Sequence, residues 1–164
     1  MSRYDGIEGF GLIFDRTIAD VNYVKSLIEK GYENMSEEER QQWRGDLKGC
    51  LNASDLNRVG IVCEWLNDRM RELGYEVSLN IKKDWNEQSF CEKKWMTDYC
   101  LNVKKVIEAV KNERMYEIPV DMENADYMDQ NRIEKNLYLM REVLDSLLDG
   151  METLVFTLRG DGFE

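Results

Sequence analysis

The chain has 164 residues, 43% of them hydrophobic and 34% charged, with one proline, and its 22 basic and 33 acidic side chains give a formal net charge of −11. This composition is typical of a single ordered, helix-rich domain, and its negative charge disfavours nucleic acid and anionic membrane surfaces as partners. No stretch approaches the roughly 20 apolar residues of a membrane span, and residues 1–6 lack the apolar core of a signal peptide, so we expect a protein that is made and folded in the cytoplasm without membrane contact.

The first two expected helices are marked by capping residues. Residues 1–14 contain several glycines and are expected to form an extended arm that packs its aromatic side chains against the body. A helix is predicted after Thr17, whose hydroxyl can accept from the Asp20 amide while Asp20 reaches back. Its buried face is predicted to consist of Ile18, Val21, Val24 and Ile28. Ser36 and Glu39 form a capping box, which predicts a second, short helix.

A long third helix is predicted to follow Ser54 and to end before Gly74. Its apolar residues recur at alternating spacings of three and four, the pattern by which one helix packs along another. These residues are Leu56, Val59, Cys63, Leu66, Met70 and Leu73. Ile61 and Trp65 form a second apolar stripe elsewhere on the circumference, so we place this helix at the centre of a bundle.

Residues 75–85 alternate apolar and polar side chains, and we expect a short extended segment that lies on the bundle, with residues 153–158 as a candidate pairing partner. Helical spacing returns over residues 96–110 and 133–151, which gives a fourth and a fifth helix. The expected fold class is therefore all-α. It is a five-helix, mainly antiparallel bundle with a flexible C-terminal tail at about residues 159–164.

The chain offers little to known catalytic mechanisms. It contains no histidine, which excludes Ser-His-Asp and Cys-His arrangements and histidine-bound metals, and it has no glycine-rich phosphate-binding motif. Its four cysteines, Cys50, Cys63, Cys91 and Cys100, have no C-x-x-C spacing, and we expect neither a metal nor a cofactor. Paired carboxylates are still available, so a carboxylate-dependent hydrolase stays open as an alternative.

The densest acidic run has two interpretations. Asp121, Glu123, Asp126 and Asp129 lie close in sequence but lack the core spacing of a calcium-binding loop. We interpret Asp126 as the cap of a solvated helix start, with weak calcium binding as the alternative.

Two of the four tryptophans are candidate contact residues. Packing at least partly in the core is the ordinary role of such a side chain, and it applies first to Trp43 and Trp65. Trp85 and Trp95 flank the polar, irregular stretch 86–94, which makes them the two candidates for exposure. They would contact a protein partner or, in an alternative function as a carbohydrate-binding module, a bacterial surface glycan.

Several short motifs occur in a fixed order along nearly the whole chain. They are Asp15-Arg16-Thr17, Asp20-Val21, Lys30-Gly31, Met35, Trp43, Leu47-Lys48-Gly49, Asp55-Leu56-Asn57-Arg58-Val59, Asp84-Trp85, Asn102-Val103, Asn131 and Ile133-Glu134-Lys135. This series resembles a module of prophage-encoded minor structural proteins of Gram-positive bacteria. The resemblance implies a tail- or baseplate-associated part with a virion-associated location, whose partners are other phage structural proteins or a second copy of itself. It supplies no catalytic residues.

The same motifs have roles in building the fold. Asp55 at a helix start complements the helix dipole, and Asn57 and Arg58 could hydrogen-bond the carbonyls of the corner at residues 47–52. The residues that we interpret as fold-defining are Thr17, Asp20, Ser36, Glu39, Ser54, Asp55, Asn57 and Arg58. The function that we expect is a non-enzymatic structural or protein-interaction module of a phage tail-like assembly.

Overall fold

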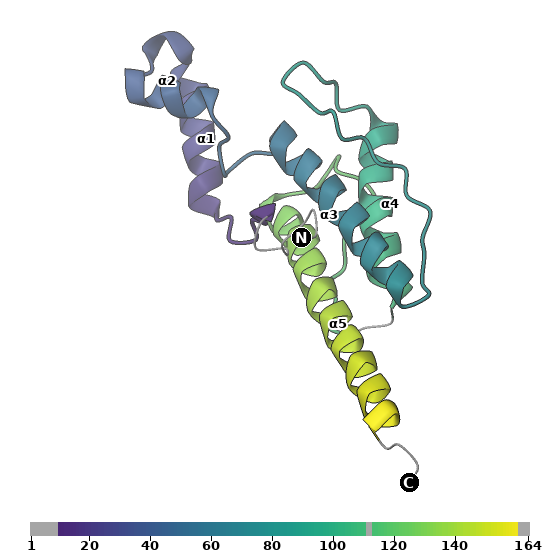
Figure 1. Cartoon of the computed structure of the whole chain (residues 1–164). Coiled ribbons are helices and arrows are strands. Elements are labelled where there is room, and N and C mark those ends of the chain that lie inside the picture. Colours follow the sequence, from purple (N-terminus) through teal and green to yellow (C-terminus); the bar gives the residue numbers. More distant parts are fainter. Residues whose placement is uncertain (1–9, 111–112, 161–164) are drawn as a thin grey trace.

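Five α-helices make up most of the computed structural model, which describes residues 10–110 and 113–160, with side chains up to residue 151 (Figure 1). They are α1 (Ile18–Lys30), α2 (Glu37–Arg44), α3 (Ala53–Glu72), α4 (Lys93–Ala109) and α5 (Tyr127–Gly160), with a short 3-10 helix, η2 (Tyr32–Asn34), between α1 and α2. The described residues contain no strand, so the prediction of an all-α helical bundle is confirmed. Within the same residues, no helix is both long enough and apolar enough to cross a membrane.

The first two helices begin at the predicted capping residues. At the start of α1 the Thr17 amide donates to the Asp20 carboxylate at 2.7 Å, and the Asp20 amide donates to the Thr17 hydroxyl at 3.3 Å. At the start of α2, Ser36 and Glu39 make the same exchange at 2.6 and 3.2 Å. These reciprocal bonds satisfy amide groups that the first turn of a helix leaves without partners.

The start of α3 differs from the prediction. Asn52 is its N-cap, and Ser54 lies inside the first turn. The Asn52 amide donates to the Asp55 carboxylate at 2.8 Å, so Asp55 completes the capping box from the third helical position. The Asn52 side chain also donates to the Leu47 and Cys50 carbonyls, at 3.0 and 3.3 Å. Asn52 bonds both the corner before it and the first turn of α3, which explains why it and not Ser54 is the N-cap.

Helices α1 and α2 form a hairpin that projects from the rest of the molecule (Figure 1). Val24 and Leu27 of α1 are buried, 8% and 1% exposed, whereas Ile18 and Ile28 are 54% and 61% exposed. The predicted buried face is therefore wrong for its two isoleucines. A projecting hairpin buries only a narrow stripe of α1, so Val21 is half-buried and the two isoleucines stay at the surface.

Helices α3, α4 and α5 form the body of the molecule, and α3 and α5 run in the same direction. Arg58 pairs with Glu134 at 3.0 Å and Arg69 pairs with Asp145 at 3.6 Å, so positions on the two helices rise together. The prediction of a mainly antiparallel arrangement is therefore wrong for the body. Short loops join antiparallel neighbours, whereas here two long connectors return the chain to the start of the next helix. They comprise residues 73–92 and 113–126.

The connector at residues 73–92 shows that α4 also has the direction of α3. Along α3, Asn57 bonds Trp85 of the connector and Asn67 bonds Val77. Along α4, Asn102 bonds Asn80 and Lys105 bonds Ser78. The connector therefore runs antiparallel to both helices. Residues 75–85 are extended, as predicted, but their predicted pairing with residues 153–158 is wrong, because the latter belong to α5.

The described part of the N-terminal arm packs its aromatic rings as expected. The Phe10 ring meets Trp65 of α3 at a centroid distance of 6.1 Å, and the Phe14 ring meets Tyr138 of α5 at 5.6 Å. Residues 1–9 of the arm lie outside the described residues. At the other end, residues 159 and 160 continue α5 and do not form the expected tail, and residues 161–164 lie outside the described part.

Candidate functional site

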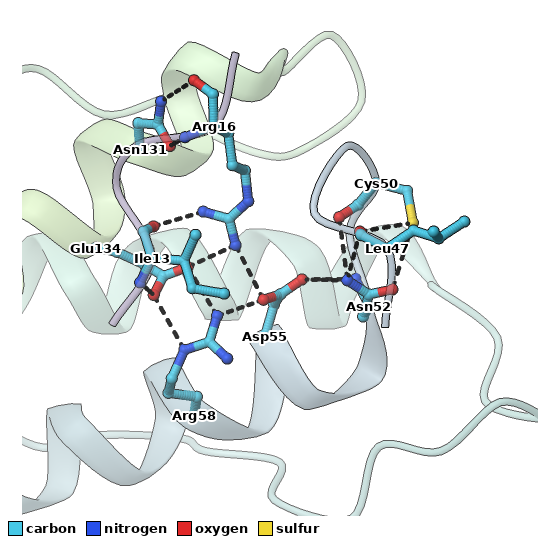
Figure 2. Close-up of polar contacts among 9 residues, drawn as sticks. All are labelled: Ile13, Arg16, Leu47, Cys50, Asn52, Asp55, Arg58, Asn131 and Glu134. Carbon is cyan, nitrogen blue, oxygen red and sulfur yellow. Dashed lines mark hydrogen bonds and ion pairs between the residues drawn. The ribbon is translucent and has the colours of Figure 1, made fainter. Parts of the chain in front are cut away.

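Four charged residues from three parts of the chain meet inside the body (Figure 2). Arg16 comes from the segment before α1, Asp55 and Arg58 from the first turns of α3, and Glu134 from α5. Arg16, Asp55 and Glu134 are only 3%, 2% and 2% exposed. We call these four residues the buried charge cluster. Its two positive and two negative charges balance, as buried ions require.

Asp55 is fully paired within the cluster. Its Oδ1 accepts from Arg16 at 2.9 Å and from Arg58. Its Oδ2 accepts from the backbone amide and from the side chain of Asn52, at 2.8 and 2.9 Å. One carboxylate thus joins the corner before α3 to both arginines (Figure 2).

Glu134 is paired in the same way. Its Oε1 accepts from Arg16 and Arg58 at 2.8 and 3.0 Å. Its Oε2 accepts from the Ile13 amide at 2.7 Å and from Arg58 Nε at 3.0 Å. Arg16 in turn donates to the Ile13 carbonyl at 2.6 Å, so the segment before α1 is bonded to α5 and to the cluster at once.

The electrostatics of the cluster favour the charged form of Arg58. Burial alone lowers the pKa of the Arg58 guanidinium, but hydrogen bonds and ion pairs with Glu134 and Asp55 raise that pKa overall. Within the described part of the chain, Arg16 Nε is one of three buried side-chain atoms without a hydrogen-bond partner. Apart from that atom, the cluster is internally satisfied, which makes it a structural lock between the arm, α3 and α5.

The cluster has the residue types of an acid–base site without the accessibility of one. General acid–base catalysis needs a carboxyl group that can reach a substrate and exchange a proton with it. Each oxygen of Asp55 and Glu134 already accepts two internal hydrogen bonds, and neither residue lines the three best-formed pockets of the described surface. This pair of acids gives no support to a carboxylate-dependent hydrolase.

Five asparagines on α3, α4 and α5 hold the backbone of extended segments. Each side-chain amide donates to the carbonyl of one residue and accepts from the amide of that same residue, at distances from 2.7 to 3.0 Å. The pairs are Asn57 with Trp85, Asn67 with Val77, Asn102 with Asn80, Asn131 with Arg16, and Asn136 with Tyr116. We call these five residues the asparagine clamps.

The clamps explain how long connectors stay in place on a helical body. A buried or half-buried backbone must bond its amides and carbonyls, and these connectors have no strand beside them. An asparagine side chain offers the same donor and acceptor that a neighbouring strand would. Of these asparagines, the sequence prediction gave a contact only to Asn57 and assigned it, with Arg58, to the corner at residues 47–52, which was wrong for both. A usable signal was a polar residue within an apolar helix face, as at Asn102 and Asn136.

Trp85 is not an exposed contact, contrary to the prediction. It is 6% exposed and its ring belongs to the core, because its clamp with Asn57 holds the connector against α3. Lys82 Nζ lies 5.2 Å from the Trp85 ring centre and 5.9 Å from that of the partly buried Trp95. The hollow between these rings measures about 20 Å³, which holds one water molecule and not a sugar ring. The proposed glycan-stacking pair is therefore absent from the described surface.

The acidic run behaves as a helix start. Asp126 accepts from two amides of the first turn of α5 at 2.7 and 3.1 Å, and Asp129 accepts from the Asp126 amide at 3.1 Å, as the capping interpretation predicts. Asp121 and Glu123 lie 3.8 and 2.9 Å from Lys93 Nζ. Over residues 10–110 and 113–160, no three metal-ligating side chains are grouped closely enough to hold an ion.

The cysteines have the environments expected of unreactive thiols, apart from one. Cys63 and Cys100 are buried, and burial raises the pKa of both, that of Cys100 to about 12. Cys50 is half-buried, and burial raises its pKa also. Cys91 is exposed.

The polar residues that first suggest a site are thus used within the chain, in the buried charge cluster and in the asparagine clamps. Several large apolar side chains also lie exposed at the surface, where a partner could cover them. Comparison with known protein families, with curated proteins and with solved structures finds no match to this chain.

Proposed function

We propose that this chain is a non-enzymatic structural or protein-interaction module of a phage tail-like assembly. Its internal polar contacts support this role, because they fix long connectors on a rigid body and leave no acid of the buried charge cluster free for chemistry. A rigid body that presents apolar side chains at fixed positions is suited to binding other proteins.

The observation that carries the proposal is a pair of exposed apolar side chains on neighbouring loops. Phe90 and Val120 are 85% and 84% exposed, and they lie on the connectors that precede α4 and α5. Lys93, the first residue of α4, pairs with Glu123 at 2.9 Å, so the start of α4 lies beside the second of these loops. When a partner covers apolar side chains that are this exposed, their removal from water stabilises the complex.

The phage setting is supported by the ordered motif series. Several of its members, Arg16, Asn57, Arg58, Asn131 and Glu134, belong to the buried charge cluster or to the asparagine clamps. The series therefore consists in large part of residues that make internal contacts of this fold. A chain that shares it would share the body, while the exposed loops are free to differ with the partner.

Isolation of tail-like particles from cells that encode the chain tests the proposal. We expect the chain to sediment with the particles and to be detected in them by mass spectrometry. The double variant Phe90→Ser and Val120→Ser is expected to fold but to be lost from the particles, whereas Tyr75→Ser, at a residue 49% exposed, keeps its place. A chain that never accompanies the particles contradicts the phage setting.

A further inference from the structure

One apolar row on α5 passes from the core to the open surface. Ile133, Leu137, Met140 and Leu144 follow one another at spacings of four, three and four, and all are fully buried. The same row continues at Leu147 and Met151, which are 41% and 48% exposed. In sequence it extends further, to Leu154 and Leu158. An apolar repeat that averages 3.5 residues is the seam of a left-handed coiled coil.

The row becomes exposed because α5 is longer than the helices that cover it. Figure 1 shows its C-terminal end extending past α3 and α4. Arg69, near the end of α3, lies beside Asp145, and α3 ends at Glu72. Beyond this level the row on α5 has no helix of the described chain packed against it (Figure 1).

The edges of the open row carry no charge. In sequence, the positions that flank it are Leu148, Gly150, Val155 and Thr157. Asp145 and Asp149 fall on the opposite side of the helix at 100° per residue. A charged partner helix would find no opposite charges here, whereas a second copy of this acidic chain meets no like charges across the seam.

We propose that residues 145–160 of α5 pair with the same segment of a second copy as a short antiparallel coiled coil. This rests on the proposed assembly role and specifies one of its contacts. The antiparallel direction follows from the body: α3 and α4 already cover the row as far as Leu144, and a parallel partner would bring its own α3 and α4 into the same space. An antiparallel partner lays its open row on this one and keeps its body beyond the far end.

The size of the contact limits its strength. The four row positions of each chain from Leu147 to Leu158, with Leu148 and Val155 beside them, would bury an area at the low end of specific interfaces, about 1,000 Å² in total. Dissociation constants in the range of tens of micromolar are therefore expected for the isolated chain, on the order of those of small transient contacts.

Sedimentation equilibrium of the 164-residue chain from about 1 μM to about 300 μM tests the pairing. The wild-type chain is expected to pass from monomer to dimer within this range. Met151→Glu places a carboxylate in the seam and is expected to weaken association at least tenfold. The control is Met128→Glu, the same change on the same helix at a residue 45% exposed, which is expected to leave the dissociation constant unchanged.

Three results would overturn the inference. A wild-type chain that stays monomeric throughout refutes the pairing, and equal association of the Met151→Glu chain refutes its location. Rapid disulfide cross-linking of a Leu147→Cys chain, in a Cys91→Ser background, refutes the antiparallel direction, because only a parallel pair brings the two Leu147 positions together. A monomeric chain that is still found in particles refutes self-association alone, and a dimer absent from particles refutes the phage setting alone.

Discussion

Asn57 on α3 and Trp85 on the following connector are bound to each other by two hydrogen bonds, of 2.8 and 3.0 Å, across 28 positions of sequence. The bonds join a side chain to a backbone, so they fix where the connector lies as well as which ring it buries. Four other asparagines repeat the arrangement on α3, α4 and α5. The parallel direction of the body helices depends on such contacts, because each return of the chain must be held in place over its whole length.

Removal of one clamp is expected to destabilise the protein measurably. Asn57→Ala leaves the Trp85 amide and carbonyl without partners in a half-buried position, at a cost of about 2 kcal/mol in the free energy of unfolding. Urea denaturation followed by circular dichroism measures this loss. Asn22→Ala, at an exposed position on α1, is the control and is expected to change the midpoint little. Equal effects of the two substitutions would show that the clamp contributes nothing.

Arg58 provides a test of the buried charge cluster. Arg58→Ala removes three of the hydrogen bonds that Asp55 and Glu134 accept, which leaves two buried acids with one arginine. The expected loss is about 3–5 kcal/mol in the free energy of unfolding, as for other broken buried ion pairs. Thermal unfolding should show a much lower midpoint. The matched control is Arg132→Ala, which removes an exposed pair with Asp129 and should cost little. An unchanged midpoint for Arg58→Ala would mean that Arg58 serves an external partner.

The starts of α1 and α2 could be predicted from the sequence, because each depends on two capping residues that lie close together in the chain. Thr17 with Asp20 and Ser36 with Glu39 bond across three positions, so their pattern is visible in a short window. The predicted start of α3 lay two residues too late. The actual cap, Asn52, also bonds a corner whose shape is set by tertiary contacts. A helix cap can thus be predicted from the sequence when the capping residue makes no other, tertiary contact.

The buried charge cluster and the helix directions could not be predicted in the same way. Arg16 and Glu134 are 118 positions apart, and neither sequence neighbourhood indicates the other. A clamp is harder still, because the partner of each asparagine is a backbone group that any residue carries. Short loops would have forced antiparallel helices, but an extended connector allows either direction, and the clamps hold it in the parallel arrangement found here.

The capping box of α2 gives a pH-dependent prediction. The hydrogen bond from Lys30 lowers the pKa of Glu39 below its ordinary value of 4.5, and the Ser36 amide adds to the effect. Because the folded-state pKa is the lower one, Glu39 contributes stability above pH 4.5 and this contribution is lost as the pH falls through the folded value. We expect an NMR titration to place the Glu39 midpoint below 4.5.

A substitution at Lys30 separates the causes of that shift. Lys30→Met removes the ammonium donor that lies 2.6 Å from the carboxylate, so the Glu39 midpoint should rise toward its ordinary value. Lys25→Met, at an exposed position on the same helix, makes the same change of charge without the bond and should leave the midpoint where it was. If both variants moved it equally, general charge and not the specific bond would be the cause.

Gly49 tests how closely the corner before α3 packs against α1, and Gly150 of α5 is the matched control. A Cβ on Gly49 would lie 2.7 Å from the Val21 amide nitrogen and closer still to the Asp20 carbonyl, both of them backbone atoms that cannot rotate away. Gly49→Ala should therefore force the corner off α1 and cost about 1–3 kcal/mol, the usual range for overpacking. A Cβ on Gly150 of α5 meets nothing within 4 Å, so Gly150→Ala should stabilise the helix by about 0.5–1 kcal/mol through propensity alone. Chemical denaturation of both variants is expected to give opposite signs, and a neutral Gly49→Ala would show that the corner does not contact α1 in solution.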